Sequence, residues 1–290
     1  MDKLVITHKR NRVTITGEYV SLDTLFQSGQ SFRFKKNAKG FFGVAYGRQI
    51  QISEVSNGFS ILPTTPEEMQ EIWTEYFDLS RSYQEIEERF AIDPIMRKTL
   101  PYCRGMRLLK QEPFETLVTF IISANNNEAR IRKIVEEICR QFGTKATGGG
   151  YAFPTPKQLS KATEEELVRC GCGYRARYIA QTAKLVRDGF DICKAGEMEY
   201  THARDYLQLL PGIGPKVADC ILLFAFRMLS AFPRDVWIVR ILQEEYHFNP
   251  KNDAETLRFI NQTFGEYAGI AQQYLFHYAR MKMRQPGVLE

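Results

Sequence analysis

The sequence predicts an α+β fold in which an antiparallel β domain precedes an all-helical domain. Residues 1 to about 63 contain short runs of alternating polar and apolar residues, separated by tight-turn signals. From Thr65 onward, apolar residues recur every three or four positions. The 290 residues are 44% hydrophobic and 25% charged, which is enough for a sizeable core. We expect the β domain to span residues 1–99 and the helical domain residues 100–290.

The predicted strands are short and rich in β-branched and aromatic residues. Residues 12–18 (RVTITGE) alternate in polarity, and further runs follow at 31–34, 41–46, 48–53 and 59–62. Turn signals containing glycine or asparagine stand at 37–40, 46–47 and 56–58. A short helix is expected at 22–28. Short strands in series with tight turns predict an antiparallel sheet that buries one face.

Helical spacing begins after Pro66, where Met69, Ile72, Trp73 and Phe77 lie three or four apart. Further helices are predicted at 82–90, 94–100, 113–122, 127–142, 156–160, 163–169, 174–187, 198–209, 215–229, 235–245, 252–264 and 268–282. The glycines at 148–150 indicate a loop.

Composition and cysteine usage narrow the class of protein. The net charge of +5 is mildly basic, which suits a nucleic-acid partner without proving one. The six cysteines are scattered along a chain that is large enough to be stable without disulfide bonds. We therefore expect free thiols in a reducing compartment. No two of the four histidines stand at ligand spacing, so we expect no catalytic metal.

Neither a secretory signal nor a membrane span is predicted. The first residues are charged and lack a long apolar core. The apolar run at 221–232 is interrupted by Arg227 and is too short to cross a bilayer. We expect an intracellular monomer, cytoplasmic and nucleoid-associated, or nuclear if the source is a eukaryote.

The stretch at 207–241 contains the residues that bear most directly on function. A glycine turn with Gly212 and Gly214 lies between two predicted helices, so a helix-hairpin-helix is expected at about 203–226. Backbone N–H groups of such a turn can hold a phosphate. Lys216 begins the second helix, and Asp235 lies just beyond its end.

Lys216 and Asp235 have the chemistry of a nucleophile and its electrostatic partner. An amine attacks carbon only when it is uncharged, and apolar surroundings and the positive end of a helix both favour the neutral form. Such an amine can displace a base from a nucleoside sugar, and a carboxylate can stabilise the cationic sugar that develops. A solvated lysine beside a helix-capping aspartate remains the alternative for these two residues alone.

Four segments of the chain resemble one family of DNA-repair enzymes. GIGPKVADC followed by FPRDV is similar to the helix-hairpin-helix, Gly/Pro-Asp signature of base-excision DNA glycosylases, in its bifunctional lysine form. MRLLKQEPFETLVTFIISANNNEARI, GYRARYIA and QSFRF resemble segments of 8-oxoguanine DNA glycosylases. The match runs in order from about Gly29 to Phe276. It implies an N-terminal antiparallel β domain packed on a helical glycosylase domain.

The resemblance implies that the chain binds duplex DNA containing 8-oxoguanine, flips the damaged nucleotide out and excises its base. Lys216 would then be the nucleophile that forms a Schiff base, with strand cleavage by β-elimination, and Asp235 the carboxylate. This is bifunctional glycosylase and AP-lyase activity in base excision repair. No cofactor is required, and carbonyls of the hairpin are a candidate site for a structural cation.

The base pocket follows from the same resemblance. N7 of guanine accepts a hydrogen bond, whereas N7 of 8-oxoguanine carries a proton, so a reader of the lesion needs an acceptor. The carbonyl of Gly29 takes this role. Gln272 and Phe276 are four apart on one helix face, and Cys220 would cover the other side of the base. An ordinary turn glycine and simple core packing are the alternatives.

The opposite strand involves a second group of residues. Asn125 would fill the gap left by the base, and Tyr174 would act as a wedge. Arg130 and Arg175 would surround the orphaned cytosine, whose O2 and N3 are acceptors suited to guanidinium donors. Cytosine opposite the lesion is therefore the expected preference. The alternative is a solvated basic face.

The chain departs from the family where a histidine is usual and Trp237 stands, two residues after Asp235. An indole cannot carry charge, so the phosphate contact expected there is weakened. Phe34 also replaces a usual tryptophan. Two rival functions remain on sequence alone: a non-enzymatic DNA-binding module that uses the hairpin as a phosphate clamp, and a hairpin glycosylase for an alkylated base or an oxidised pyrimidine.

Overall fold

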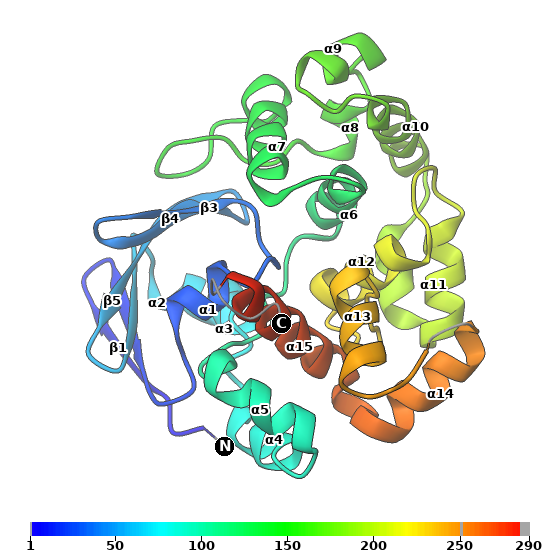
Figure 1. The fold of residues 1–290 in the computed structure, drawn as a ribbon. Coiled ribbons are helices and arrows are strands. Elements are labelled where there is room, and N and C mark those ends of the chain that lie inside the picture. Colours follow the sequence, from blue (N-terminus) through cyan, green and yellow to red (C-terminus); the bar gives the residue numbers. More distant parts are fainter. Residues whose placement is uncertain (1, 250–251, 285–290) are drawn as a thin grey trace.

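A six-stranded antiparallel sheet forms one side of the molecule in the computed structural model, which describes residues 2–249 and 252–284 (Figure 1). Its strands are β1 (Val5–Lys9), β2 (Arg12–Thr16), β3 (Phe34–Asn37), β4 (Gly40–Ala45), β5 (Arg48–Val55) and β6 (Gly58–Leu62). Their order in the sheet is β1-β2-β6-β5-β4-β3. The antiparallel pairing, and turns at the predicted places between β3 and β6, confirm the predicted β region.

Two strand assignments differ from the prediction. Strand β1 was not predicted, because all five of its residues are exposed and show no hydrophobic alternation. A strand at 31–34 was wrong, since β3 begins only at Phe34. The chain before it is held instead by the buried amide of Gln30, which donates to the carbonyls of Leu25 (3.1 Å) and Arg107 (2.9 Å). A side chain therefore satisfies backbone groups that a sheet would otherwise pair.

The remaining regular elements of the described chain are helices joined by loops, as the spacing predicted. The N-terminal helical segments are α1 (Leu22–Phe26), α2 (Pro66–Glu68), the π-helical η1 (Met69–Trp73), α3 (Thr74–Tyr76), α4 (Tyr83–Phe90) and α5 (Pro94–Cys103). Next come α6 (Pro113–Ser123), α7 (Glu128–Phe142), α8 (Pro156–Leu159), α9 (Glu164–Arg169) and α10 (Arg175–Arg187). The last are the 3₁₀ segment η2 (Ile192–Glu197), α11 (Tyr200–Gln208), α12 (Pro215–Phe226), α13 (Val236–Glu244), α14 (Asp253–Phe264), the 3₁₀ segment η3 (Gly265–Tyr267) and α15 (Ala268–Arg284).

Helix α12 ends three residues earlier than predicted. Arg227 adopts a left-handed conformation with φ 53°, and its N–H bonds to the carbonyl of Leu222. Its guanidinium lies 3.1 Å from the carboxylate of Asp78, so an ion pair to the β side of the molecule holds this strained residue. The segment η2 was not predicted, because a single 3₁₀ stretch has no long periodic pattern.

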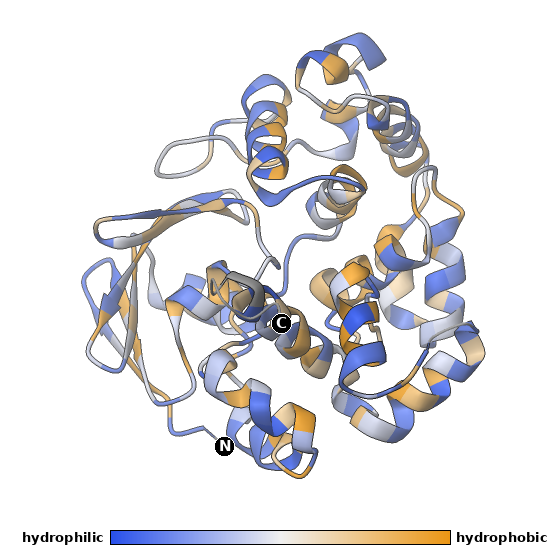
Figure 2. Cartoon of the chain, in the orientation of Figure 1, coloured by the Kyte–Doolittle hydropathy of each residue, from blue (hydrophilic) through white to orange (hydrophobic). Residues whose placement is uncertain are grey.

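The strands and helices enclose two hydrophobic cores. The smaller lies between the sheet and α1 to α3, around the fully buried Trp73. The larger lies among the helices and includes the buried faces of α4 and α5. Amphipathic helices supply it, as in α7, where Ile131, Ile134 and Ile138 face inward and charged residues face outward (Figure 2). The domain division after residue 99 stays a prediction, and residues 285–290 lie outside the described chain.

Helix α15 connects the two sides of the molecule (Figure 1). It packs against α5 and α13, and the amide of Gln273 donates to the carbonyl of Ser28 at 2.8 Å. The loop that follows α1 is thereby fixed against the helical core. All six cysteines are free thiols, as expected. Among the described residues, no helix combines the length and apolarity needed to cross a bilayer.

Candidate active site

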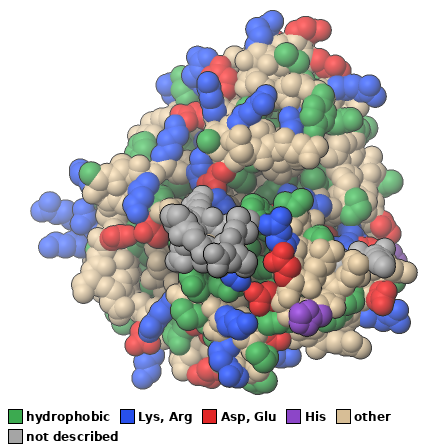
Figure 3. All heavy atoms as spheres, viewed as in Figure 1, with side chains coloured by type: hydrophobic (Ala, Val, Ile, Leu, Met, Phe, Trp, Pro, Cys, Tyr) green, Lys and Arg blue, Asp and Glu red, His purple; other side chains and the backbone are tan. Residues whose placement is uncertain are grey.

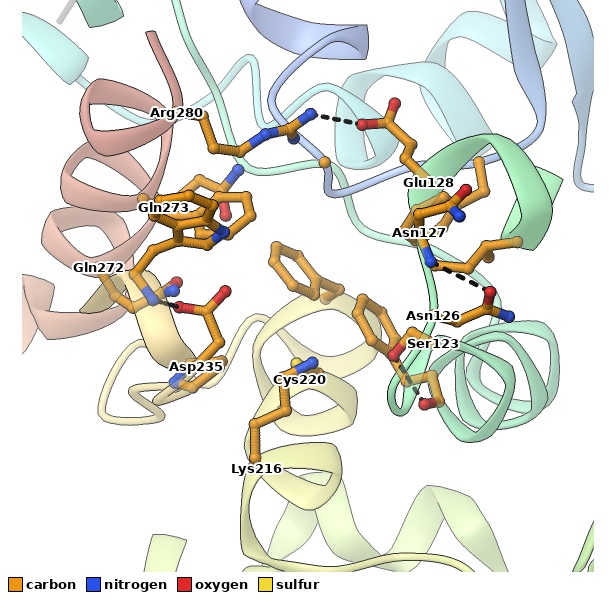
Figure 4. Close-up of a pocket in the computed structure, with 18 residues that line it drawn as sticks. Ser123, Asn126, Asn127, Glu128, Lys216, Cys220, Asp235, Gln272, Gln273 and Arg280 are labelled. Carbon is orange, nitrogen blue, oxygen red and sulfur yellow. Dashed lines mark hydrogen bonds and ion pairs between the residues drawn. The ribbon is translucent and has the colours of Figure 1, made fainter. Parts of the chain in front are cut away.

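A cavity of about 350 Å³ opens between α6, α7, α12 and α15. Figure 4 shows its labelled residues facing one space, and Figure 3 shows the same face of the molecule as a hydrophobic hollow with charged side chains around it. Seven of the predicted site residues line the cavity: Gly29, Lys216, Cys220, Asp235, Trp237, Gln272 and Phe276. These seven residues come from three segments far apart in the sequence: the loop at Gly29, residues 216–237, and helix α15.

Lys216 stands in the first turn of α12, half-buried in the cavity wall. Its Nζ lies 5.7 Å from the centre of the Phe120 ring. The N-cap of this helix is Gly214, which has no side chain to cap the first N–H groups. Cys220 lies one turn further on the same face, and burial raises the pKa of its thiol to about 11. It is therefore a neutral, apolar wall at physiological pH.

Asp235 is both the N-cap of α13 and a cavity residue. Its Oδ1 accepts hydrogen bonds from the N–H groups of Trp237 and Ile238, each at 3.0 Å. Both bonds use the same oxygen, and the carboxylate faces the cavity (Figure 4). Burial raises the pKa of Asp235, while the two N–H donors and the charge of Lys216 oppose that rise. Capping of α13 therefore uses only Oδ1, and the second carboxylate oxygen of Asp235 makes neither of these two capping bonds.

Gly29 forms the opposite wall in a conformation that excludes a side chain. Its φ is +78°, and a Cβ there would lie 2.7 Å from Nη1 of Arg280 and 2.9 Å from Cε1 of Phe276. Gln273 holds the preceding carbonyl, so the loop cannot easily move away. Absence of a side chain allows a ligand to approach this backbone closely.

Gly29→Ala is expected to destabilise the fold by about 1–3 kcal/mol through its positive φ, and to lower the base-excision activity expected from the sequence on the order of 10²-fold by displacing Phe276 and Arg280. Gly47→Ala is the matched control, because Gly47 has φ +69° and nothing within 4 Å of its Cβ position. Thermal unfolding and single-turnover kinetics on both variants separate strain from pocket distortion. Equal activity in the two variants would contradict the assignment of Gly29.

Gln272 presents an unsatisfied polar group to the cavity. The residue is only 4% exposed, and among the described residues its Oε1 has no hydrogen-bond partner. A buried acceptor left unpaired costs about 1–3 kcal/mol, so a ligand donor is the natural partner. Phe276, one turn later on α15, lines the same cavity. The cavity wall thus presents an amide and an aromatic ring from adjacent turns of one helix.

The residues predicted for the opposite strand lie outside this cavity. Arg175 is 4% exposed, and its guanidinium donates to the carbonyls of Ala124 (2.8 Å) and Asn125 (3.0 Å). It also stacks on Tyr174, whose side chain is 60% exposed. Arg130 is exposed on the first turn of α7. The structure therefore brings Asn125, Tyr174 and Arg175 together, with Arg175 as their anchor.

The two hairpin glycines differ in their surroundings. Gly212 has φ +83°, and a Cβ there would lie 2.8 Å from Cβ of Tyr178, so only glycine fits. Gly214 faces open space. Within residues 2–249 and 252–284, no three His, Cys, Asp or Glu side chains gather into a metal-binding group.

Several cavity residues were not predicted. They are Phe32, Phe120, Ser123, Asn126, Asn127, Glu128, Ile131, Phe224, Pro233, Gln273 and Arg280. Arg280 follows Phe276 by four residues, so the spacing that paired Gln272 with Phe276 could also have identified it. Asn126 and Asn127 belong to the triplet from which only Asn125 was chosen. The phenylalanines Phe32, Phe120 and Phe224 could not be told from ordinary core residues by their sequence pattern.

Comparisons with known proteins identify the family of the chain. A family model described as the N-terminal domain of 8-oxoguanine DNA glycosylase matches residues 12–117, and one described as HhH-GPD superfamily base excision DNA repair protein matches residues 118–266. The probable N-glycosylase/DNA lyase of Methanothermobacter thermautotrophicus is 37% identical, with 75% of each protein covered. The N-glycosylase/DNA lyase of Saccharomyces cerevisiae is 31% identical, with 93% of this chain and 86% of the yeast protein covered.

A solved structure shares the whole fold. The Clostridium acetobutylicum 8-oxoguanine glycosylase/lyase, in complex with double-stranded DNA containing cytosine opposite 8-oxoG, superposes with a TM-score of 0.91. It is 34% identical, and the match covers 97% of this chain and 99% of that one. By both family models, by these relatives and by its fold, the chain belongs to the 8-oxoguanine DNA glycosylases of the HhH-GPD superfamily.

Proposed function

We propose that the protein excises 8-oxoguanine from duplex DNA as a bifunctional glycosylase and AP lyase of base excision repair, with a preference for cytosine opposite the lesion. The observation that carries this proposal is the shared cavity of Lys216 and Asp235, whose other walls are Gly29, Gln272 and Phe276. The names of the relatives, N-glycosylase/DNA lyase and 8-oxoguanine glycosylase/lyase, support the same activity.

The chemistry begins when the damaged nucleotide leaves the helix and its base enters the cavity. The amine of Lys216 first gives up the proton that carries its charge. It then attacks C1′ as the bond to N9 breaks, and the base departs with the bonding electrons and takes up a proton. The carboxylate of Asp235 stabilises the positive charge that develops on the sugar. Loss of the amine proton and opening of the sugar ring produce a Schiff base at C1′.

Strand cleavage follows from the Schiff base. Removal of a proton from C2′ converts the protonated imine into an enamine with a C1′=C2′ double bond. That electron pair then forms a C2′=C3′ double bond as the C3′–O bond breaks and the imine is restored, which releases the downstream strand with a 5′ phosphate. Hydrolysis of the imine then frees Lys216. This sequence needs no cofactor, and the family matches indicate none. A structural cation at the hairpin carbonyls and a monomeric state remain predictions.

Base selection rests on the cavity walls. The carbonyl of Gly29 accepts the N7 proton that 8-oxoguanine has and guanine lacks. The amide of Gln272 binds the pairing edge of the base, which satisfies its buried oxygen. Phe276 stacks on one face of the base, and the neutral thiol of Cys220 covers the other.

Recognition of the opposite cytosine depends on two arginines with different duties. Arg175 holds the carbonyls of Ala124 and Asn125 and so fixes the loop that fills the gap in the duplex. Arg130 is exposed beside this loop and is free to address O2 and N3 of cytosine.

Arg130→Ala is expected to reduce the preference for cytosine over adenine about tenfold, because the donors matched to cytosine are lost. Arg177→Ala is the control: it removes an exposed arginine from α10 and should weaken binding equally for every opposite base. Single-turnover excision from duplexes with each of the four opposite bases measures both variants. An unchanged preference in Arg130→Ala would exclude this residue as the reader.

Borohydride trapping tests the proposal as a whole. The protein is incubated with 8-oxoguanine·cytosine duplex and sodium borohydride, which reduces a Schiff base to a stable adduct. A covalent adduct is expected. Specific binding without an adduct would favour a non-enzymatic phosphate clamp. A panel of duplexes with alkylated purines and oxidised pyrimidines tests the second rival, which predicts faster excision of one of those bases.

A further inference from the structure

An ion pair spans the mouth of the cavity from α7 to α15 (Figure 4). Oε2 of Glu128 lies 2.6 Å from Nη2 of Arg280, and the two side chains are 28% and 15% exposed. Both residues line the cavity that holds Lys216 and Asp235. The pair is therefore part of the pocket and not a surface contact.

The carboxylate of Glu128 is fixed on its other side by Arg132. Oε1 accepts from Nε of Arg132 at 3.2 Å and from Nη2 at 2.8 Å. Arg132 itself donates to the carbonyls of Phe34 (2.5 Å) and Ser31 (3.1 Å), which tie it to the β side. Burial alone would raise the pKa of Glu128, but its two arginine partners lower it overall, so the carboxylate is ionised at neutral pH.

Arg280 lies against the residue that reads the lesion. Its Nη1 is 2.7 Å from the Cβ position of Gly29, and its guanidinium lies 5.4 Å from the centre of the Phe276 ring. An arginine next to Gly29 would face the O6 and N7 edge of a base in the cavity. A guanidinium fork binds O6 and N7 of ordinary guanine in a bidentate manner, so such an arginine would favour the undamaged base. The N7 proton of 8-oxoguanine would meet a donor instead. A free Arg280 would thus select the undamaged base.

We propose that Glu128 is a specificity-determining residue, which holds Nη2 of Arg280 and so keeps the two-nitrogen fork from binding undamaged guanine in the flipped position. The inference rests on the proposed function. Glu128 acts through Arg280 and touches neither the sugar nor the scissile bond. Its removal therefore changes the choice between two bases, and not the chemistry at C1′.

Four variants test this role: Glu128→Gln, Arg280→Met, the double variant, and Glu136→Gln. The last removes an exposed carboxylate of the same helix, which pairs with Lys35 outside the cavity. Single-turnover excision is measured on 8-oxoguanine·cytosine and guanine·cytosine duplexes. Inhibition of 8-oxoguanine excision by 9-methylguanine and by 9-methyl-8-oxoguanine reports occupancy of the pocket directly, and thermal unfolding monitors folding.

Glu128→Gln is expected to lower the 8-oxoguanine-over-guanine ratio on the order of tenfold, with tighter inhibition by 9-methylguanine. The double variant should recover the wild-type ratio, and Glu136→Gln should keep it. An unchanged ratio in Glu128→Gln would overturn the inference. So would a reduced ratio in Arg280→Met, since Arg280 would then read the lesion itself, and this variant decides the matter even if Glu128→Gln folds poorly. A wild-type protein inactive on both duplexes would instead reject the proposed function.

Discussion

Lys216→Gln is expected to abolish base excision and borohydride trapping, with a loss of about 10³-fold or more in the single-turnover rate. Glutamine is polar and one atom shorter than lysine, but its amide nitrogen is not a nucleophile. Gly214 and the rest of the hairpin are untouched, so binding to 8-oxoguanine·cytosine duplex should persist. Trapping, excision and equilibrium binding are measured on the same preparation.

Lys161→Gln is the control for loss of a positive charge, because Lys161 is exposed and does not line the cavity. It should retain full excision and trapping. Measurable turnover by Lys216→Gln would reject the nucleophile assignment. A loss of trapping together with a loss of binding would point instead to a role of Lys216 in gripping DNA.

Asp235→Asn is expected to lower excision by about 10²–10³-fold while leaving the fold nearly as stable. Asparagine is as good an N-cap as aspartate, so its side-chain oxygen can still accept from the N–H groups of Trp237 and Ile238. Only the negative charge facing the developing sugar cation is lost. The comparison of unfolding temperature with excision rate therefore separates the structural duty of Asp235 from its catalytic duty.

The pH dependence gives a second view of Asp235. The residue acts as a carboxylate, and burial raises its pKa from the ordinary value of aspartate. Excision should therefore decline on acidification at a higher pH than a solvent-exposed aspartate would produce, because protonation removes the charge. The remaining activity of Asp235→Asn should lack this acid limb.

Asp219 supplies the alternative origin for such a limb. It is buried on α12 beside Cys220, and burial raises its pKa to about 7 although Arg204 opposes the rise. An acid limb that persists in Asp235→Asn would assign the titration to a group other than Asp235, and its loss in Asp219→Asn would identify Asp219 as that group. A limb that disappears would assign it to Asp235.

Much of the fold could be predicted from local sequence patterns. Long helices such as α7 have a periodic apolar face, and the hairpin glycines mark their turn. The errors occurred where local patterns are silent. Strand β1 is exposed along its length, and the early end of α12 depends on an ion pair between Arg227 and the distant Asp78. Neither feature leaves a mark in neighbouring residues.

The residues of the candidate site also fall into those that local spacing predicts and those that depend on distant contacts. The pairs Lys216 with Cys220 and Gln272 with Phe276 were accessible from the chain itself, because a four-residue step on a helix sets both members on one face. Arg280 could have been found by the same four-residue step, and Asn126 and Asn127 from the triplet that also contains Asn125. The buried anchoring role of Arg175 could not, since its partners are backbone carbonyls some fifty positions away.

Three features of this protein follow from its amino-acid sequence alone: a hairpin with a lysine at the start of its second helix, an aspartate at the cap of the next helix, and a β domain that precedes both. Those features depend on hydrogen bonds and side-chain spacing within a few residues. Tertiary packing alone decided that Gly29 lies against Phe276 and Arg280, and that Glu128 joins Arg280 across the cavity. Such contacts depend on how α7, α15 and the loop after α1 come to lie together, and long-range packing of this kind leaves no periodic trace in sequence.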